Sequence, residues 1–289
     1  MQSRMMANGP SHADNAGAGR DDNALARAMF DLDNERPQDA ERIAAEILKI
    51  DPHHARAQYI LGCALTMQGR AGDAIAPLEA ATRGHEDPVI DTMLAIALRQ
   101  VGRHEDAVSR LKLATERRPP NATAFNELGY LLVLMGRYDE ATDVLSRGLE
   151  IAPTMPQLSI QLGYAHLSRR DCANAKFAFA RALDVSPCSH DALFGMAKAY
   201  QELGENEEAA AYFRRYLTNR PDDSGAWLNL GHCLLELGQP DAGYECFRRV
   251  ARGDAKHYGD ALTSLAAAAR GRFWLRPSEA ARFLRASQS

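Results

Sequence analysis

The hydrophobic positions of this chain follow a pattern that returns at a fixed interval. Residues 124–153, AFNELGYLLVLMGRYDEATDVLSRGLEIAP, contain two apolar stretches with helical spacing, which predict two helices closed into a hairpin. A small residue marks the same place in each predicted second helix: Ala40, Ala74, Ala107, Ala141, Ala175, Ala209 and Gly243. Successive members of this series are 34, 33, 34, 34, 34 and 34 residues apart. A fixed period in this range predicts a stacked array of helical repeats.

The period divides the chain into seven repeats with a further segment at each end. Laid end to end from Asp21, the repeats span 21–54, 55–87, 88–121, 122–155, 156–189, 190–223 and 224–257. Residues 1–20 are rich in Gly, Ala, Asn, Ser and Asp without periodicity, so we expect a disordered leader there. The pattern weakens after residue 257, and we expect capping helices in 258–289, with Phe273 and Trp274 covering the end of the stack.

Glycine residues predict where the first helix of a repeat ends. Such stops are found at Gly69, Gly102, Gly136, Gly204 and Gly238. Glycine tolerates the left-handed conformation that the C-terminal end of a helix often needs. Repeat five has Arg170 at this place, so we expect a strained or altered helix end there. The acidic residues that follow these turns oppose the positive end of the second helix, which is a capping role rather than a metal-binding one.

A small residue in the first helix is predicted to face a small and a large residue of the second helix. The first-helix series is Ala28, Gly62, Ala95, Gly129, Gly163, Ala197 and Gly231. The large residues, four positions after the second-helix small residue, are Leu78, Leu111, Leu145, Phe179, Phe213 and Phe247. Spacing of four keeps both residues on one helix face, so the axes can approach closely while the large side chain fills the space around the contact.

These residues resemble the consensus of the tetratricopeptide repeat (TPR) family, W-x2-L-G-x2-Y followed by A, an aromatic residue, A and P. The segments WLNLGHCL (227–234) and FNELGYLL (125–132) match it best, and the resemblance covers residues 21–257. It implies an all-α fold, a right-handed α-solenoid of stacked antiparallel helix pairs with a concave groove lined by the first helices. The resemblance also implies that the groove holds peptides or partner proteins, and it supplies no catalytic residues.

The same resemblance assigns positions 2, 5, 9 and 12 of each first helix to the groove, opposite the inward positions 4, 7, 8 and 11. These positions are apolar and aromatic from repeat four to repeat seven, whereas a merely solvated face is mostly charged. An alternative is that positions 5 and 12 pack against the neighbouring repeat, which would account for Ile160, Leu167, Phe194 and Leu228. The predicted partner-binding residues are Tyr59, Ile96, Asn126, Tyr130, Val133, Ile160, Tyr164, Phe194, Lys198, Leu228 and His232, centred on position 9 (Tyr130, Tyr164, Lys198, His232).

Two groove chemistries known in the family do not match this chain. Asn126 and Lys198 are present, but the rest of a clamp of Lys, Arg and Asn for a terminal carboxylate is missing. A ladder of asparagines for an extended backbone is also missing, since only Asn126 and Asn229 come near it, at different positions. We therefore expect a helical or apolar segment in the groove.

Composition and charge argue against one class of partner and predict the cellular compartment. The 34 basic and 38 acidic residues are dispersed, with no run of Lys or Arg, so we expect no binding of nucleic acid. Five cysteines without a CxxC pair predict free thiols in a reducing compartment, with a Cys233–Cys246 disulfide left open as an alternative. The N-terminus lacks the apolar region of a signal peptide and the chain has no long apolar run. The sequence thus predicts a cytoplasmic protein without a membrane span, and the excess of Arg over Lys favours a bacterial source.

No catalytic motif is present: the chain lacks GxSxG, HExxH, a Walker phosphate loop and GxGxxG. We expect no cofactor and no metal, and interpret the chain as a non-catalytic protein–protein interaction scaffold. One alternative is an accessory, substrate-docking subunit of a separately encoded glycosyl- or sulfotransferase, because the chain ends too soon after its last repeat to contain a catalytic half. Another is a self-associating assembly protein, a homo-oligomer in which the groove takes the leader or the stacks join end to end.

Overall fold

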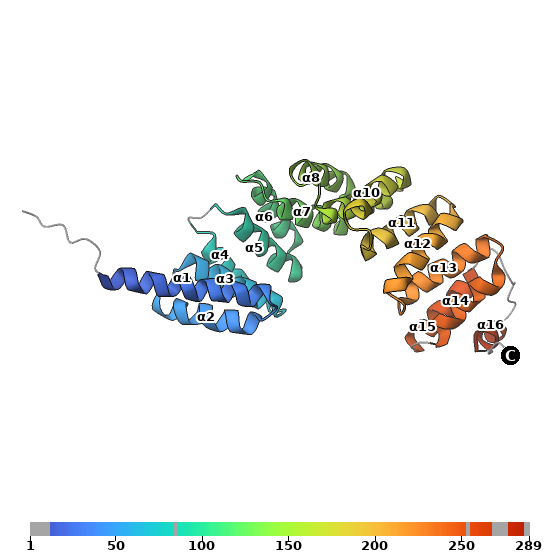
Figure 1. Cartoon of the computed structure of the whole chain (residues 1–289), viewed down its shortest axis with the longest axis horizontal. Helices are drawn as coiled ribbons and strands as arrows, with labels where there is room; N and C mark the ends of the chain where they lie inside the picture. The colour runs from blue at the N-terminus through green and yellow to red at the C-terminus, as the bar shows by residue number, and fades with distance from the viewer. Residues whose placement is uncertain (1–11, 84–85, 253–254, 268–276, 286–289) are drawn as a thin grey trace, which may run out of the picture. The chain divides into compact units, whose positions relative to one another are not determined.

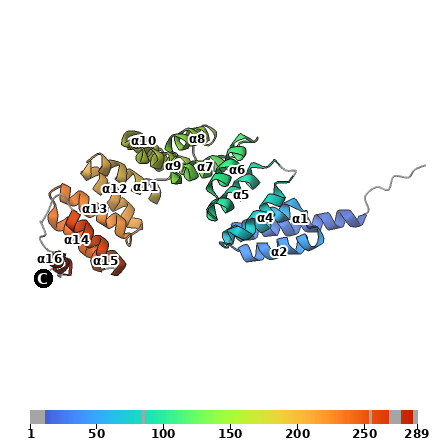
Figure 2. The ribbon, with the colours of Figure 1, turned by 180° about the vertical axis from the view of Figure 1, so that it is seen from behind.

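The computed structural model describes residues 12–83, 86–252, 255–267 and 277–285, and all regular elements in these ranges are α-helices. They are α1 (His12–Asp33), α2 (Pro37–Ile50), α3 (Ala55–Met67), α4 (Ala71–Ala81), α5 (Pro88–Gln100), α6 (His104–Glu116), α7 (Ala122–Leu134), α8 (Tyr138–Ile151), α9 (Pro156–Ser168), α10 (Cys172–Val185), α11 (His190–Glu202), α12 (Asn206–Asn219), α13 (Ser224–Glu236), α14 (Pro240–Arg252), α15 (Ala255–Ala267) and α16 (Pro277–Arg285). Consecutive helices form hairpins, which Figures 1 and 2 show from opposite sides.

The helix bounds follow the 34-residue pattern closely. Each predicted repeat from 55–87 to 224–257 contains two helices, from α3 and α4 to α13 and α14. The start of the chain differs, because α1 begins at His12, inside the segment expected to be a disordered leader. Three alanines among residues 12–20 favour a helix there. Residues 1–11 lie outside the described part of the chain, and so do Phe273 and Trp274, whose capping role stays a prediction.

The chain forms two compact units, Met1–Leu131 and Leu132–Ser289, with the boundary inside α7 (Figure 1). In the first unit, the core between α1, α2 and α3 is built from leucine, isoleucine and alanine side chains such as Leu25, Ala44 and Ile60. In the second unit, Phe179, Phe213 and Phe247 are fully buried among alanine and leucine side chains. The second unit also contains α15 and α16, which cover Phe247 and Val250 of α14 with Leu265 and Leu284.

The first helices end as the glycine pattern predicted. Positive φ angles of 71° to 81° occur at Gly69, Gly102, Gly136, Gly204 and Gly238. Arg170 also has a positive φ, 59°, so the helix end of repeat five keeps the conformation of the glycine turns and is strained rather than altered. At both kinds of turn the backbone N–H groups bond back to the end of the first helix, as Asp171 N does to His166 O at 2.9 Å. Glu35, in the first repeat, adopts the same conformation with φ 57°, which the sequence analysis missed.

Small residues allow large side chains to enter the contacts between helices. A Cβ atom added at Gly163 would lie 2.6 Å from the ring of Phe179, and one added at Gly195 would lie 2.3 Å from the same ring. Phe179, on α10, is therefore held between the backbones of α9 and α11, which belong to neighbouring repeats. Leu78 approaches Gly62 equally closely in the first unit. The predicted pairing of small and large residues is thus a contact within a hairpin, and Phe179 also reaches the next hairpin through Gly195, which the predicted series does not include.

The cysteines are all free, so the alternative of a Cys233–Cys246 disulfide is wrong. Cys233 and Cys246 are both buried, as are Cys63 and Cys172, while Cys188 is exposed. Burial raises the pKa of the Cys233 and Cys246 thiols to about 11. The four buried cysteines therefore serve as small apolar side chains in the core.

Replacing Arg170 by glycine is expected to stabilise the second unit. An L-residue in the left-handed conformation costs about 1–2 kcal/mol, and glycine relieves most of this at some cost in chain entropy, so we expect a gain of about 1 kcal/mol. The matched control is Gly204→Arg at the same place of the next repeat, where φ is 74° and a loss of similar size is expected. Guanidinium unfolding followed by circular dichroism measures both; a lower midpoint for Arg170→Gly would contradict the expectation.

Candidate binding surface

In the first unit, the predicted groove positions bring four residues to the surface of α3, α5 and α7: Tyr59, Ile96, Asn126 and Tyr130. Tyr59 packs against the core of α1 to α3, and this burial raises the pKa of its hydroxyl well above the usual range. Ile96 is half-buried. Tyr130 is 37% exposed, and the guanidinium of Arg99 lies over its ring, 5.1 Å from the centroid. Tyr130 is the member of this group with the most ring surface available to a partner.

Polar atoms around Tyr130 are buried without hydrogen-bond partners. They are Nε of Arg99 and Oδ1 of Asn126. The Arg99 guanidinium also pairs with Glu127 at 3.8 Å between Nη2 and Oε2. Burial raises the pKa of the Glu127 carboxyl, and the charge of Arg99 opposes this shift. The surface beside Tyr130 thus combines an aromatic face with a guanidinium group, while the two unpaired atoms lie beneath it.

In the second unit, three of the predicted residues face the core more than the surface. Ile160 is only 7% exposed and belongs to the cluster around Phe179. The ring of Phe194 packs against Phe213 and Tyr216, with centroid distances of 5.7 and 5.3 Å. Leu228 packs against the cluster of α14 to α16, and Leu167 against that of Ile160. The alternative interpretation, that positions 5 and 12 pack against the neighbouring repeat, fits Ile160, Leu167 and Leu228, whereas the two rings that Phe194 meets belong to its own repeat.

The position-9 residues of the second unit lie over its buried phenylalanines. The ring of Tyr164 meets Phe179 edge to face at 5.2 Å, and its hydroxyl donates to Asp191 O at 3.1 Å. The imidazole of His232 meets Phe247 in the same way, also at 5.2 Å.

Lys198, between them on α11, donates from Nζ to Oε1 of Gln201 at 2.9 Å. Val133, at the start of the second unit, is half-buried. Tyr164, Lys198 and His232 therefore form a half-buried row on α9, α11 and α13, with both ends anchored on aromatic rings.

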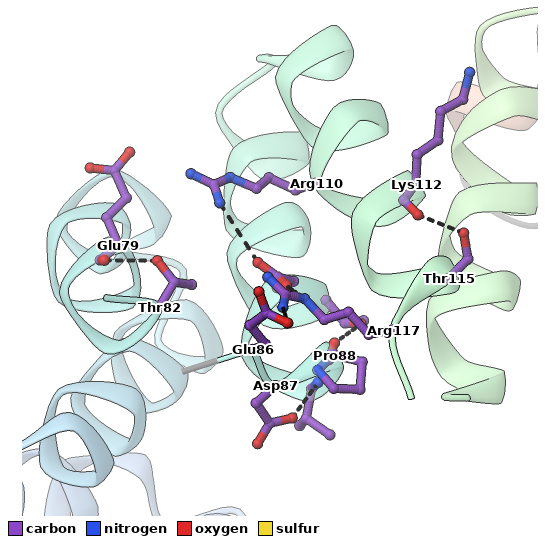
Figure 3. Close-up of polar contacts among 12 residues, drawn as sticks. Glu79, Thr82, Glu86, Asp87, Pro88, Arg110, Lys112, Thr115 and Arg117 are labelled. Carbon is purple, nitrogen blue, oxygen red and sulfur yellow. Dashed lines mark hydrogen bonds and ion pairs between the residues drawn. The ribbon is translucent and has the colours of Figure 1, made fainter. Parts of the chain in front are cut away.

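The sequence analysis missed a buried carboxylate in the first unit. Asp91 on α5 is 1% exposed and accepts a hydrogen bond from Nε of Arg117 at 2.6 Å. Arg110 approaches it at 3.7 Å, and Arg117 also pairs with Glu86 at 3.3 Å (Figure 3). The available signal was an acidic residue at inward position 4 of its repeat. Because both partners are arginines of the same hairpin, we interpret Asp91 as a link between α5 and the end of α6.

Neither a metal centre nor a membrane segment emerges from the described residues. Among them, no three His, Cys, Asp or Glu side chains come together in a way that could bind a metal ion. No helix in the same ranges is long and apolar enough to cross a membrane.

The hairpins and their small-residue contacts define a helical repeat protein of the α-solenoid class. A family model described as tetratricopeptide repeat matches residues 25–88, 92–156, 160–224 and 194–257. The chain therefore belongs to the tetratricopeptide repeat family. Comparison with curated protein sequences gives no match.

Solved structures of other TPR proteins share the fold. PilW, described as a widely conserved type IV pilus biogenesis factor, matches with 18% identity and a TM-score of 0.66 over 73% of this chain and 97% of PilW. PilF of Pseudomonas aeruginosa matches with 19% identity and a TM-score of 0.62 over 71% and 96% of the two chains. The C-terminal part of a TPR protein from Cytophaga hutchinsonii has 13% identity and a TM-score of 0.64 over 82% and 99%. At these identities the likeness shows the fold alone.

The stability of the second unit is expected to fall in mild acid because of His232. Burial lowers the pKa of its imidazole below the usual 6.5, with nearby Glu236 opposing the shift. The unfolded chain then binds more protons than the folded chain as the pH falls below about 6.5, so acid favours unfolding. His166, whose pKa burial also lowers, acts in the same direction.

We expect His232→Phe to reduce the loss of melting temperature between about pH 7.5 and about pH 5.5, because the phenyl ring keeps the contact with Phe247 and cannot be protonated. Calorimetry of wild type and variant at both pH values measures the effect. An unchanged pH dependence in the variant would contradict this role of His232.

Proposed function

We propose that this protein is a non-catalytic scaffold that binds a peptide segment of a partner protein on the groove side of its first helices. Membership of the TPR family supports a role in protein interactions. The observation that carries the proposal is the surface around Tyr130, where an exposed ring lies beside the partly exposed cation of Arg99.

The chemistry of this surface fits a peptide better than a small polar ligand. Tyrosine is a frequent anchor of interfaces, and the cation of Arg99 holds the ring of Tyr130 in place without covering it. Arg99 and Asn126 are both partly exposed beside the ring, and their side chains can make further polar contacts to a peptide. An apolar side chain on the same segment would cover the Tyr130 ring.

In the second unit we propose a separate contact surface formed by Tyr164, Lys198 and His232. These residues keep partial exposure although their rings pack on Phe179 and Phe247. Anchored side chains lose little rotamer freedom on binding, which favours affinity. We place the protein in the cytoplasm of a bacterium, since free buried cysteines fit a reducing compartment.

Affinity capture from the lysate of the native host tests the proposal. Full-length wild type is compared with Tyr130→Ala, which removes the exposed ring, and with the control Phe177→Ala on α10, which removes an aromatic ring that is 67% exposed on a second helix. We expect the captured partner to bind Tyr130→Ala at least about tenfold more weakly, as is typical for an interface anchor, and Phe177→Ala as tightly as wild type.

The same experiment separates the alternatives. A partner that binds Tyr130→Ala as tightly as wild type but is lost from Phe177→Ala would contradict the groove proposal. Capture of a glycosyl- or sulfotransferase would favour the accessory-subunit alternative. Capture of the chain itself, with a sedimentation coefficient that rises with concentration, would favour self-association.

A further inference from the structure

The second unit contains an open cleft of about 660 Å³ between α12, α13 and α14. This volume lies within the range of about 300–1,000 Å³ that is usual for ligand sites. The side chains that form its apolar wall are Leu217, Trp227, Leu230, Leu234, Ala242 and Cys246. Figures 1 and 2 both show the three helices as neighbours near the C-terminal end of the described chain.

The cleft lies on the side of α13 that faces away from the proposed groove. Trp227, Leu230 and Leu234 occupy positions 4, 7 and 11 of their repeat, whereas the groove positions of this helix include Leu228 and His232. The remaining lining residues come from the second helices α12 and α14. A ligand in the cleft would therefore leave the groove side of α13 free.

Two residues that line the cleft are smaller than their counterparts in the preceding repeat. In the preceding repeat, Tyr200 and Tyr212 stack with their ring centroids 5.5 Å apart and an interplanar angle of 18°. The residues 34 positions further on are Leu234 and Cys246, which are much smaller and line the cleft. The two tyrosine rings therefore occupy, in their own repeat, the place that corresponds to the cleft in the next repeat.

The rim of the cleft carries an excess of positive charge. Arg214, Arg249 and Arg252 line it and are exposed, and Glu245 is the one acidic residue among the described lining residues. Arg252 pairs with Glu245 at 3.2 Å. The guanidinium of Arg249 lies over the Trp227 ring, 4.4 Å from its centroid, which keeps a cation at the edge of the apolar wall. Two of the three arginines thus have no carboxylate among the lining residues.

From this juxtaposition of an empty apolar cleft and unneutralised arginines, we propose a second binding site, which takes an acidic segment of a partner protein. One large apolar side chain of the segment enters between Leu217, Leu234 and Cys246, and its flanking carboxylates pair with Arg214 and Arg249. Arginine pairs with carboxylates through two parallel hydrogen bonds, so both features of the cleft are used at once. The site does not depend on the surface around Tyr130.

Fluorescence anisotropy with a synthetic probe tests this site directly. The probe is a fluorescein-labelled peptide with a central tryptophan flanked by aspartates, and its neutral twin has asparagines in their place. We expect wild type to bind the acidic probe with a dissociation constant below about 1 mM and to bind the neutral twin at least about tenfold more weakly. The affinity for the acidic probe should fall as the salt concentration rises. No binding to wild type, or equal binding of the two peptides, would overturn the proposal.

Two variants locate the probe. Cys246→Tyr restores the ring found at Tyr212 and closes the cleft, and Arg249→Glu reverses the charge at its rim. Each variant is expected to bind the acidic probe at least about tenfold more weakly than wild type does. Because Arg249 is exposed, its replacement preserves the fold even where the larger Cys246→Tyr change does not.

The matched control is Arg215→Glu. Arg215 stands 34 residues before Arg249, is also exposed and lies over the Tyr212 ring at 5.2 Å, where the tyrosine pair leaves no cleft. It should bind the probe as wild type does, and so should Tyr130→Ala. If Arg215→Glu lowers the affinity for the acidic probe as much as Arg249→Glu does, the effect comes from the net charge of the protein and the proposed site is wrong. Concentration-dependent dimerisation that Arg249→Glu abolishes would assign the cleft to a second copy of the chain instead and would overturn the proposal too.

Discussion

The contact between Phe179 and two glycines of neighbouring repeats is the constraint on which the second unit depends. The ring is fully buried because Gly163 and Gly195 have no Cβ, and added Cβ atoms would lie 2.6 and 2.3 Å from it. One side chain therefore joins the two helices of its own hairpin to the first helix of the next. The part of this contact within the hairpin is made again where Phe247 meets Gly231.

This packing decides which surface residues are available to a partner. Tyr164 and His232 follow directly after the small residues Gly163 and Gly231, so their rings rest on Phe179 and Phe247 and are only partly exposed. Tyr130, with Arg99 over its ring, retains more exposure. On the opposite side, Leu234 and Cys246 stand where the preceding repeat has a tyrosine pair, and they line the cleft beside Trp227. The surface around Tyr130 and the cleft thus both depend on side chains that vary from repeat to repeat.

Much of this frame could be predicted from the sequence, because it rests on local chemistry. The glycine stops and the unusual Arg170 follow from which residues tolerate a positive φ. The depth of burial could not be predicted in the same way. Periodicity assigns Ile160 to a helix face, but how far the neighbouring helices cover that face depends on their side chains. Asp91 is a similar case, since its partner Arg117 lies 26 residues away and beyond the next helix.

A double-mutant cycle between Gly163 and Phe179 tests the central claim most directly. Gly163→Ala should lower the free energy of unfolding of the second unit by about 1–3 kcal/mol, because the added methyl group overlaps the phenyl ring. In a Phe179→Leu background the same change should cost much less, whereas Gly72→Ala, which meets no atom within 4 Å, should cost nothing in either background. If the cost of Gly163→Ala is the same with Phe and with Leu at position 179, the ring does not pack closely against α9 and the central role of Phe179 is contradicted.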